Sequence, residues 1–185
     1  MKEISLNILD IATNSVRADA TQVDVTVEYA TIANTLTVII ADNGKGMTEE
    51  FLKSVTDPFT TTRTTRRVGL GIPLFRQSVT LTGGTFDITS RVGVGTKTSA
   101  TYVLDSIDRM PMGDLASTMT TLVGLKDSIR YKLVYRVDGR EFVFDTDEVK
   151  DILGEVSISA PEVTAFLTEY ISSGIKNING GSEVI

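Results

Sequence analysis

The segment 42–47, Asp-Asn-Gly-Lys-Gly-Met, constrains the fold more than any other part of the sequence. It directly follows residues 35–41 (TLTVIIA), whose β-branched side chains predict a strand. Two glycines one residue apart let the backbone approach a flat ligand, and the carboxylate of Asp42 can accept hydrogen bonds from an exocyclic amine. An Asn-Gly hairpin turn is the alternative interpretation of these six residues alone. The segment therefore indicates either a turn or one wall of a ligand pocket.

The first predicted element is a helix over residues 4–18 (ISLNILDIATNSVRA), which carries a polar stripe. The stripe consists of Asn7, Asp10, Asn14 and Arg17. A stripe on an otherwise apolar helix faces either bulk water or a polar ligand inside a pocket. A carboxylate and an amide one turn apart supply oxygen ligands of the kind that Mg²⁺ takes. The stripe is therefore also a candidate metal site.

The elements up to residue 104 predict an α+β fold. Strands are predicted over 23–29, 35–41, 85–90 and 97–104, with a short helix from the N-cap Thr48 to Val55 and another from Gly69 to Leu81 that Gly83-Gly84 ends. The order is helix, hairpin, short helix, loop, helix, hairpin. Such an order indicates a two-layer sandwich with the helices on one face of a mixed or antiparallel sheet.

Residues 106–185 form a predicted C-terminal extension of mixed α/β character, after a first domain over 1–105. Its predicted elements are a helix over 114–123 ended by Gly124, strands over 129–137 and 140–145 joined by Asp138-Gly139, a helix to Leu153 with Thr146 as its N-cap, and a helix from Pro161 to Gly174. We expect the extension either to pack as a small core against the first domain or to bind a protein partner. The last ten residues, rich in Asn and Gly, are expected to fray.

Residues 57–69 (DPFTTTRTTRRVG) combine five threonines and three arginines with little apolar content. This composition predicts a loop, which is either flexible and solvated or a lid whose guanidinium groups neutralise phosphates. Gly69-Leu70-Gly71 then opens the next helix. A helix N-terminus behind glycines can bind an anion.

Composition excludes several classes of function. The sequence has no cysteine and no histidine, which removes disulfides, thiolate or imidazole metal sites, and Ser-His-Asp catalysis. The absence of cysteine fits a reducing compartment, so a cytoplasmic location is expected. The net charge of −6 offers no broad basic surface for nucleic acid. No apolar run approaches the roughly 18 residues of a membrane span.

Five motifs in a fixed order resemble the GHKL superfamily of ATP-binding domains (the Bergerat fold), and most closely its histidine-kinase branch. They are D10-x-x-x-N14, DNGKGM, PFTTTR, GLGI and GVGT, and the resemblance covers about residues 4–104. It implies ATP and Mg²⁺ as cofactors. It also implies that Asn14 binds Mg²⁺, that Arg17 contacts phosphate, and that Asp10 is the catalytic acidic residue near the attacking group.

The remaining ATP-binding residues follow from the same resemblance. The adenine-binding carboxylate falls on Asp42, and further contacts fall on Gly44, Gly46, Met47, Arg63, Gly69, Leu70, Gly71 and Thr96. Two departures stand out, because Asp10 replaces the more usual Glu and Arg67-Val68 stands where the kinases have Gly-Thr. The helical hairpin with a phosphoacceptor histidine is also missing from the sequence.

The resemblance leaves three hypotheses for function. The first is a phosphotransferase that passes the γ-phosphate to another protein in trans, as the anti-sigma-factor kinases of this superfamily do. The second is an ATP-gated conformational switch with slow hydrolysis, which would form a homodimer. The third is a nucleotide-binding module without catalysis, whose acidic extension binds a protein partner.

Overall fold

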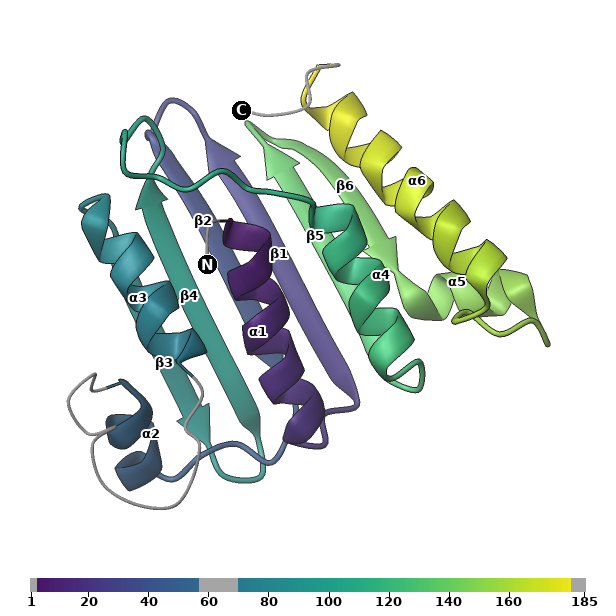
Figure 1. The fold of residues 1–185 in the computed structure, drawn as a ribbon, viewed down its shortest axis with the longest axis horizontal. Helices are drawn as coiled ribbons and strands as arrows, with labels where there is room; N and C mark the ends of the chain where they lie inside the picture. The colour runs from purple at the N-terminus through teal and green to yellow at the C-terminus, as the bar shows by residue number, and fades with distance from the viewer. Residues whose placement is uncertain (1–2, 57–69, 181–185) are drawn as a thin grey trace.

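A mixed sheet of six strands carries helices across one face (Figure 1). The computed structural model describes residues 3–56 and 70–180. The strands are β1 (Gln22–Ala30), β2 (Thr35–Asp42), β3 (Thr85–Arg91), β4 (Gly95–Val103), β5 (Arg130–Val137) and β6 (Arg140–Asp145). The helices are α1 (Ile4–Arg17), α2 (Glu49–Thr56), α3 (Gly71–Leu81), α4 (Leu115–Leu125), α5 (Thr146–Leu153) and α6 (Pro161–Ile178). This two-layer α+β arrangement confirms the predicted fold class.

The strand order is β3-β4-β2-β1-β5-β6, and only the pair β1–β5 is parallel. Helices α3, α1 and α4 lie side by side over the sheet, and α6 packs against α4 (Figure 1). Among the described residues, no helix is both long and apolar enough to cross a lipid bilayer.

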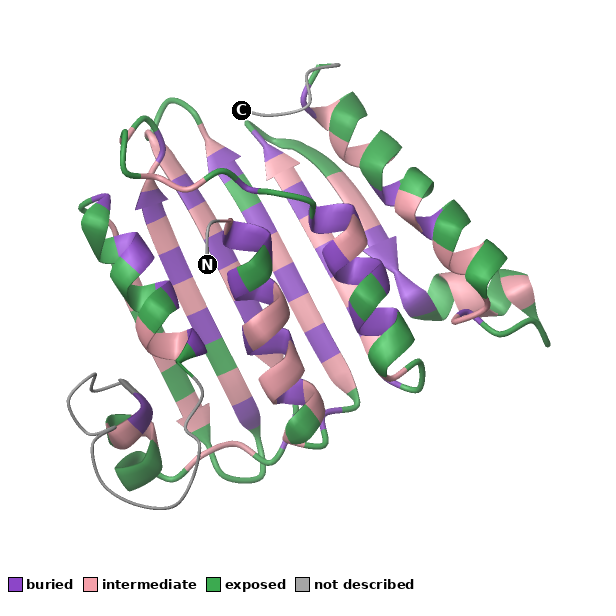
Figure 2. Cartoon of the chain, viewed as in Figure 1, coloured by how far each residue is buried: buried purple, intermediate pink, exposed green. Residues whose placement is uncertain are grey.

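Alternating side chains explain why only one face is covered. Along β1, Val23, Val25 and Val27 are fully buried under the helices, whereas the residues between them point to the other face (Figure 2). The same alternation holds along β5, where Tyr131 and Leu133 are buried. An antiparallel-rich sheet with polar residues on its second face can leave that face in water.

The C-terminal extension continues the same sheet. Strand β5 lies parallel to β1 with Val25 opposite Leu133, and β6 then pairs with β5. One hydrophobic core therefore runs from α1 and β1 through Phe144 of β6 to Leu167 of α6. The division of the chain near residue 105 separates two sequence patterns whose strands share one sheet.

Several predicted turns and caps are confirmed. Thr48 caps α2, since its hydroxyl accepts from the Phe51 amide at 3.2 Å. Helix α3 ends in a Schellman motif, in which the amides of Gly83 and Gly84 donate to carbonyls of the last helical turn at 3.0 and 3.1 Å. The Asp138-Gly139 turn has positive φ at both residues, as a two-residue hairpin requires.

Three predicted helix ends are wrong. Helix α4 continues through Gly124 to Leu125, and α6 continues through Gly174 to Ile178. Gly174 instead lets α6 approach β6, because a Cβ there would collide with the ring of Phe142. The cap of α5 is Asp145, which accepts from the Asp147 amide, and not Thr146. The Thr146 hydroxyl instead accepts from the Tyr131 amide at 2.9 Å.

The two helical glycines give a matched test of this packing. Gly174→Ala should destabilise the protein by about 1–3 kcal/mol, because the Phe142 ring must move to admit the methyl group. Gly124→Ala should stabilise it by up to about 1 kcal/mol, because nothing lies near its Cβ position and Ala favours a helix. Urea unfolding of both variants measures the difference. Equal effects would contradict the close contact of α6 with β6.

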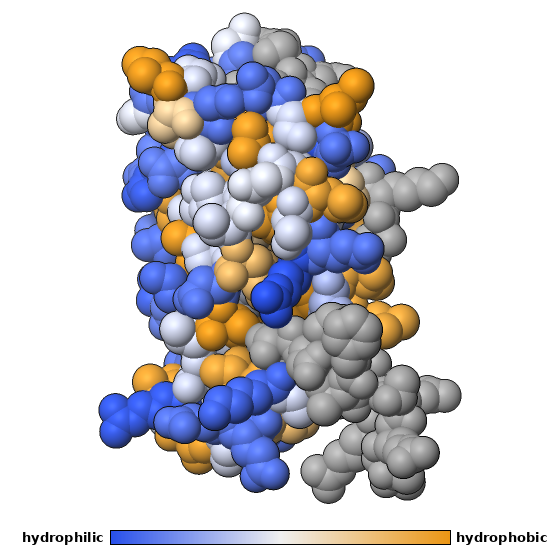
Figure 3. Space-filling view, turned by 90° about the vertical axis from the view of Figure 1, so that its left-hand side faces the viewer, coloured by the Kyte–Doolittle hydropathy of each residue, from blue (hydrophilic) through white to orange (hydrophobic). Residues whose placement is uncertain are grey.

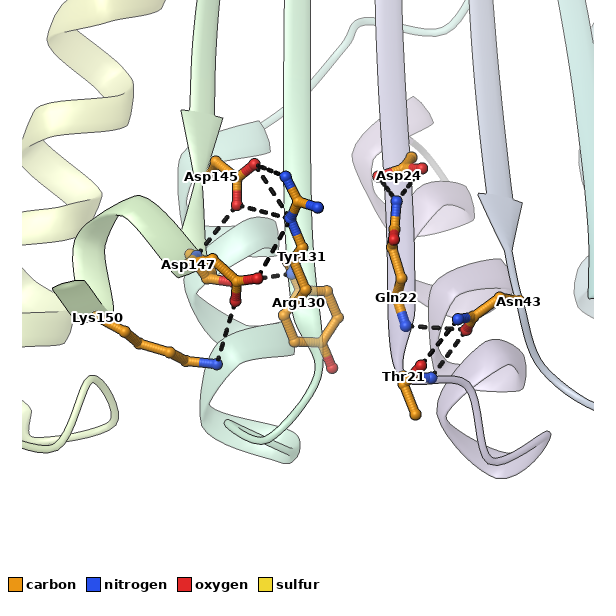
Figure 4. A network of polar contacts seen from close by, with 10 residues as sticks. Thr21, Gln22, Asp24, Asn43, Arg130, Tyr131, Asp145, Asp147 and Lys150 are labelled. Carbon is orange, nitrogen blue, oxygen red and sulfur yellow. Dashed lines mark hydrogen bonds and ion pairs between the residues drawn. The ribbon is translucent and has the colours of Figure 1, made fainter.

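A network of charged side chains lies at the end of the sheet where β5 begins (Figure 4). The Arg130 guanidinium donates to both carboxylate oxygens of Asp145, at 2.6 Å for the shortest contact. It also lies 3.5 Å from the carboxylate of Asp147. The hydrogen bonds from Arg130 hold the pKa of Asp145 below its usual range, although burial opposes this shift.

Asp145→Asn tests this network through pH. A carboxylate with a lowered pKa in the folded state contributes stability that is present above its unfolded pKa of 3.8 and is lost as the pH falls through its folded pKa. Asn keeps the α5 cap, so the variant removes mainly the charge. We expect its melting temperature to be lower than that of the wild type at pH 7, with the gap closing below pH 3.8. The control Asp87→Asn, on an exposed position of β3, should show no such gap.

Candidate nucleotide-binding site

The site is built around Asp42, the last residue of β2. The sheet register places it between Val23 of β1 and Thr96 of β4, with its half-buried side chain on the helix-covered face. The Ser15 hydroxyl donates to Oδ2 at 2.6 Å, and the Gly44 amide donates to Oδ1 at 2.9 Å. These two bonds fix the plane of the carboxylate. An ionised carboxylate has about four acceptor positions, so it can still accept from an amine.

Ser15 is a site residue that sequence analysis missed. It follows the predicted metal ligand Asn14 directly, but it lies on the core side of α1 with only 2% of its surface exposed. It falls four residues after Ile11, at the spacing of the buried face. A hydroxyl at a position reserved for apolar side chains was the signal that could have identified it. Because it is buried, its hydroxyl needs a partner, which Asp42 provides.

The loop after Asp42 packs closely against other parts of the protein's own backbone. A Cβ at Gly44 would lie 2.8 Å from the Ala18 carbonyl, and a Cβ at Gly46, whose φ is +66°, would collide with the Arg91 carbonyl. The two glycines thus allow close packing against the end of α1 and the β3–β4 turn. The sequence predicts that the two glycines let the backbone approach a ligand. In the structure they also let the loop pack against the protein's own backbone.

Asn43 anchors the start of this loop (Figure 4). Its side-chain oxygen accepts from the amides of Thr21 and Gln22, each at 2.9 Å, and its amide donates to the Thr21 hydroxyl at 2.8 Å. The residue after the key carboxylate is therefore tied to the start of β1. These hydrogen bonds fix the position of the neighbouring Asp42 at the end of β2.

Ser90 is the second residue that sequence analysis missed. Its hydroxyl accepts from the Met47 amide at 2.9 Å and lies 2.8 Å from the Thr96 hydroxyl. It also lies 3.0 Å from the Gly95 carbonyl. Met47 and Thr96, both predicted ATP contacts, are thus joined by one hydroxyl from β3. The signal that could have identified Ser90 was a polar residue on the apolar side of a strand with alternating side chains.

The polar stripe of α1 faces α3 in its first half. Asn7 is 1% exposed, and both its amide atoms lack a hydrogen-bond partner among the described residues. Asn7 is one of the residues that line a cavity of about 130 Å³ between α1, α3 and Met110. The Asp10 carboxylate lies against Gly71, where a Cβ would collide with it. The stripe is therefore not a simple solvent face.

The second half of the stripe opens outward. Asn14 is half-buried, and Arg17 is exposed and donates to the Asn14 side-chain oxygen at 3.5 Å. Asp10 and Asn14 stand one helical turn apart. Their oxygens suit a Mg²⁺ ion that keeps water and phosphate as its other ligands. Among residues 3–56 and 70–180, no group of three or more acidic side chains is placed so that it could hold a metal ion.

Two of the predicted ATP contacts, Arg63 and Gly69, lie outside the described residues, as does the whole segment 57–69. Leu70 and Gly71 form the start of α3, and Leu70 is 64% exposed. The described residues thus bring together Asp42, Gly44, Gly46, Met47 and Thr96 at one end of the sheet. Asp10, Asn14 and Arg17 lie along α1, whose Ser15 contacts that group.

Two solved structures share this fold. The N-terminal domain of a DNA repair protein superposes with a TM-score of 0.52 at 10% identity, over 77% of this chain and 52% of that one. The ATPase domain of Aquifex aeolicus MutL, complexed with ADP, superposes with a TM-score of 0.50 at 14% identity, over 83% and 69%. At these identities the likeness shows the fold alone. The chain spans about half the length of the first of these proteins.

The family follows from the sequence match. Residues 2–106 match the model of the histidine kinase-, DNA gyrase B-, and HSP90-like ATPases. This match covers more than half of the chain, so the protein belongs to that family, and the GHKL resemblance is confirmed. No curated protein matches the sequence.

The Asp42 carboxylate gives the sharpest test of the site. Asp42→Asn should weaken ATP binding at least tenfold, because an amide cannot serve the adenine amine and Ser15 as the carboxylate does. Ser15→Ala should weaken ATP binding by a smaller factor, because the carboxylate stays but loses its orientation. Calorimetry measures both affinities, with Asp108→Asn, an exposed carboxylate on a loop, as the control. Wild-type ATP affinity in Asp42→Asn would overturn the assignment.

Proposed function

We propose that this protein binds Mg-ATP and transfers the γ-phosphate to a partner protein in trans. The observation that carries the proposal is the Asp42 carboxylate, which Ser15 and Gly44 orient at the end of β2. In a chain of this ATPase family, a fixed acceptor in that place suits the adenine amine of ATP.

The residues of α1 take the phosphate end of the nucleotide. Asn14 would hold Mg²⁺, which when bound neutralises charge on the phosphates. Arg17 supplies a guanidinium for a phosphate oxygen, since its exposed side chain lies within reach of Asn14. Asp10 positions the attacking hydroxyl. Positioning and charge stabilisation provide most of the catalysis in phosphoryl transfer.

Transfer in trans agrees with the composition. The 185 residues contain no histidine, so a phosphohistidine would have to form on another protein. Asp10 is one methylene shorter than Glu and is held against Gly71 at the start of α3. This restricts its reach and favours a role in orienting an incoming hydroxyl over proton abstraction.

Labelled ATP tests the transfer. The protein with γ-labelled ATP, Mg²⁺ and an extract of its own cells should pass label to a distinct protein band. The protein alone should form no acid-labile phosphohistidine. An ATP-gated switch predicts a different result, in which ATP induces a dimer measurable by light scattering while no protein takes up label. That result would replace the transfer proposal.

Asn14→Ala tests the metal role separately. We expect this variant to lose the tightening of ATP binding by Mg²⁺ and the transfer of label, but to keep metal-free nucleotide binding, because Asp42 remains in place. Calorimetry with Mg²⁺ and with a chelator gives the comparison, and Asn177→Ala on the exposed side of α6 is the matched control. If Mg²⁺ tightens binding in Asn14→Ala as in the wild type, the metal is held elsewhere.

A further inference from the structure

A groove lies between α5, α6 and β6, on the opposite flank of the sheet from α2 and α3 (Figure 1). Its volume is about 300 Å³. Its apolar lining includes Phe144 on β6, Val149 and Ile152 on α5, and Val163, Phe166 and Tyr170 on α6. We call it the α5–α6 groove. None of these residues belongs to the proposed nucleotide site.

Three large apolar side chains in the lining of the α5–α6 groove are exposed. Ile152 is 86% exposed, Phe166 is 65% exposed, and Tyr170 is 46% exposed. Clustered large apolar side chains at a surface mark an interaction site more often than single ones do. On the flank formed by α3 and β3, by contrast, apolar atoms appear in separate patches between hydrophilic ones (Figure 3).

The aromatic wall of the groove is preformed. The rings of Phe166 and Tyr170 are stacked, with centroids 6.4 Å apart and planes 15° apart. Tyr170 also packs on Phe142 of β6 with centroids 5.6 Å apart. Because β6 contacts this pair of stacked rings, the rings lose little conformational entropy when a partner binds.

Acidic residues outnumber basic ones on the two helices that line the groove. Residues 146–178, which contain both helices, have six acidic and two basic residues. Glu162 and Glu169 stand one turn before and one turn after Phe166 on α6, and Glu148 lines the groove itself. Lys150, one of the two basic residues, lies 3.9 Å from the carboxylate of Asp147. The groove therefore has an apolar floor and lies between two helices of net negative charge, and we call Glu148, Glu162 and Glu169 its acidic rim.

We infer that the α5–α6 groove docks an amphipathic helical segment of another protein, with apolar anchors flanked by Lys or Arg. Helix-in-groove recognition uses anchors at i, i+3, i+4 and i+7, and the basic flanks would complement the acidic rim. The rim argues against two other occupants. A second copy of this chain would place acidic rim against acidic rim in an isologous dimer. An anionic membrane surface would be repelled.

A peptide selection tests the inference on the full chain. A random display library, unbiased in charge, is selected on the wild-type protein, and the consensus peptide is synthesised with a fluorescent label. We expect apolar residues at helical spacing with Lys or Arg beside them. Binding by anisotropy should fall at least tenfold in Ile152→Ser and in Phe166→Ser. Ile107→Ser, which removes an isoleucine that is 98% exposed from the 105–113 connector, should bind as the wild type does.

The rim has its own variants. Glu162→Gln with Glu169→Gln should weaken the peptide several-fold and flatten the dependence of binding on salt, because screened charge pairs are lost. The matched double variant Glu49→Gln with Glu50→Gln removes the same charge from exposed positions of α2 and should have no effect. Thermal unfolding confirms that each variant folds, and ATP calorimetry should be unchanged by all of them. Failure of ATP binding in the wild type would affect only the proposed function.

Four outcomes would overturn the inference. They are a library that yields no consensus, a consensus rich in Asp or Glu, peptide binding that survives Ile152→Ser and Phe166→Ser, and self-association or binding to phosphatidylserine vesicles that Phe166→Ser abolishes. The last outcome would assign the groove to a second copy or to a lipid surface.

Discussion

The pairing of β1 with strands on both sides holds this protein together. Strand β1 bonds antiparallel to β2, which carries Asp42, and parallel to β5, which belongs to the extension. Its buried valines contribute to one core that both regions share. Because β1 is paired along both edges, its hydrogen bonds fix the register of β2 on one side and of β5 on the other. The position of the Asp42 carboxylate thus depends on a strand that the extension also stabilises.

Local patterns in the sequence were enough to predict most elements. Alternation identified the strands, Asp138-Gly139 identified a hairpin, and Thr48 identified a helix start. Gly174 was read as a helix stop, because a local pattern cannot show that Phe142, more than thirty residues earlier in the chain, fills the space beside it. The pairing of β5 with β1 could not be predicted from local patterns either, since strand order is decided by burial across the whole sheet.

The same distinction applies to the site. The motifs identified Asp42 and Thr96, which the sheet register places opposite each other. They did not identify Ser15 and Ser90, whose hydroxyls orient the predicted residues. A motif marks side chains that a family uses on ligands, whereas supporting hydroxyls are recognised by burial and distance. Arg63 and Gly69 lie outside the described residues, and the ligand roles of all these residues stay predictions.

The contact of Asp10 with Gly71 has a consequence for how these two positions can change together. A side chain at position 71 would occupy the space that the Asp10 carboxylate fills. A longer acid at position 10 would meet the same backbone, so it would require α3 to begin farther from α1. The short acid and the glycine therefore form a compatible pair. In directed evolution toward a glutamate at position 10, substitutions should be made in the first turn of α3 and at position 10 at the same time.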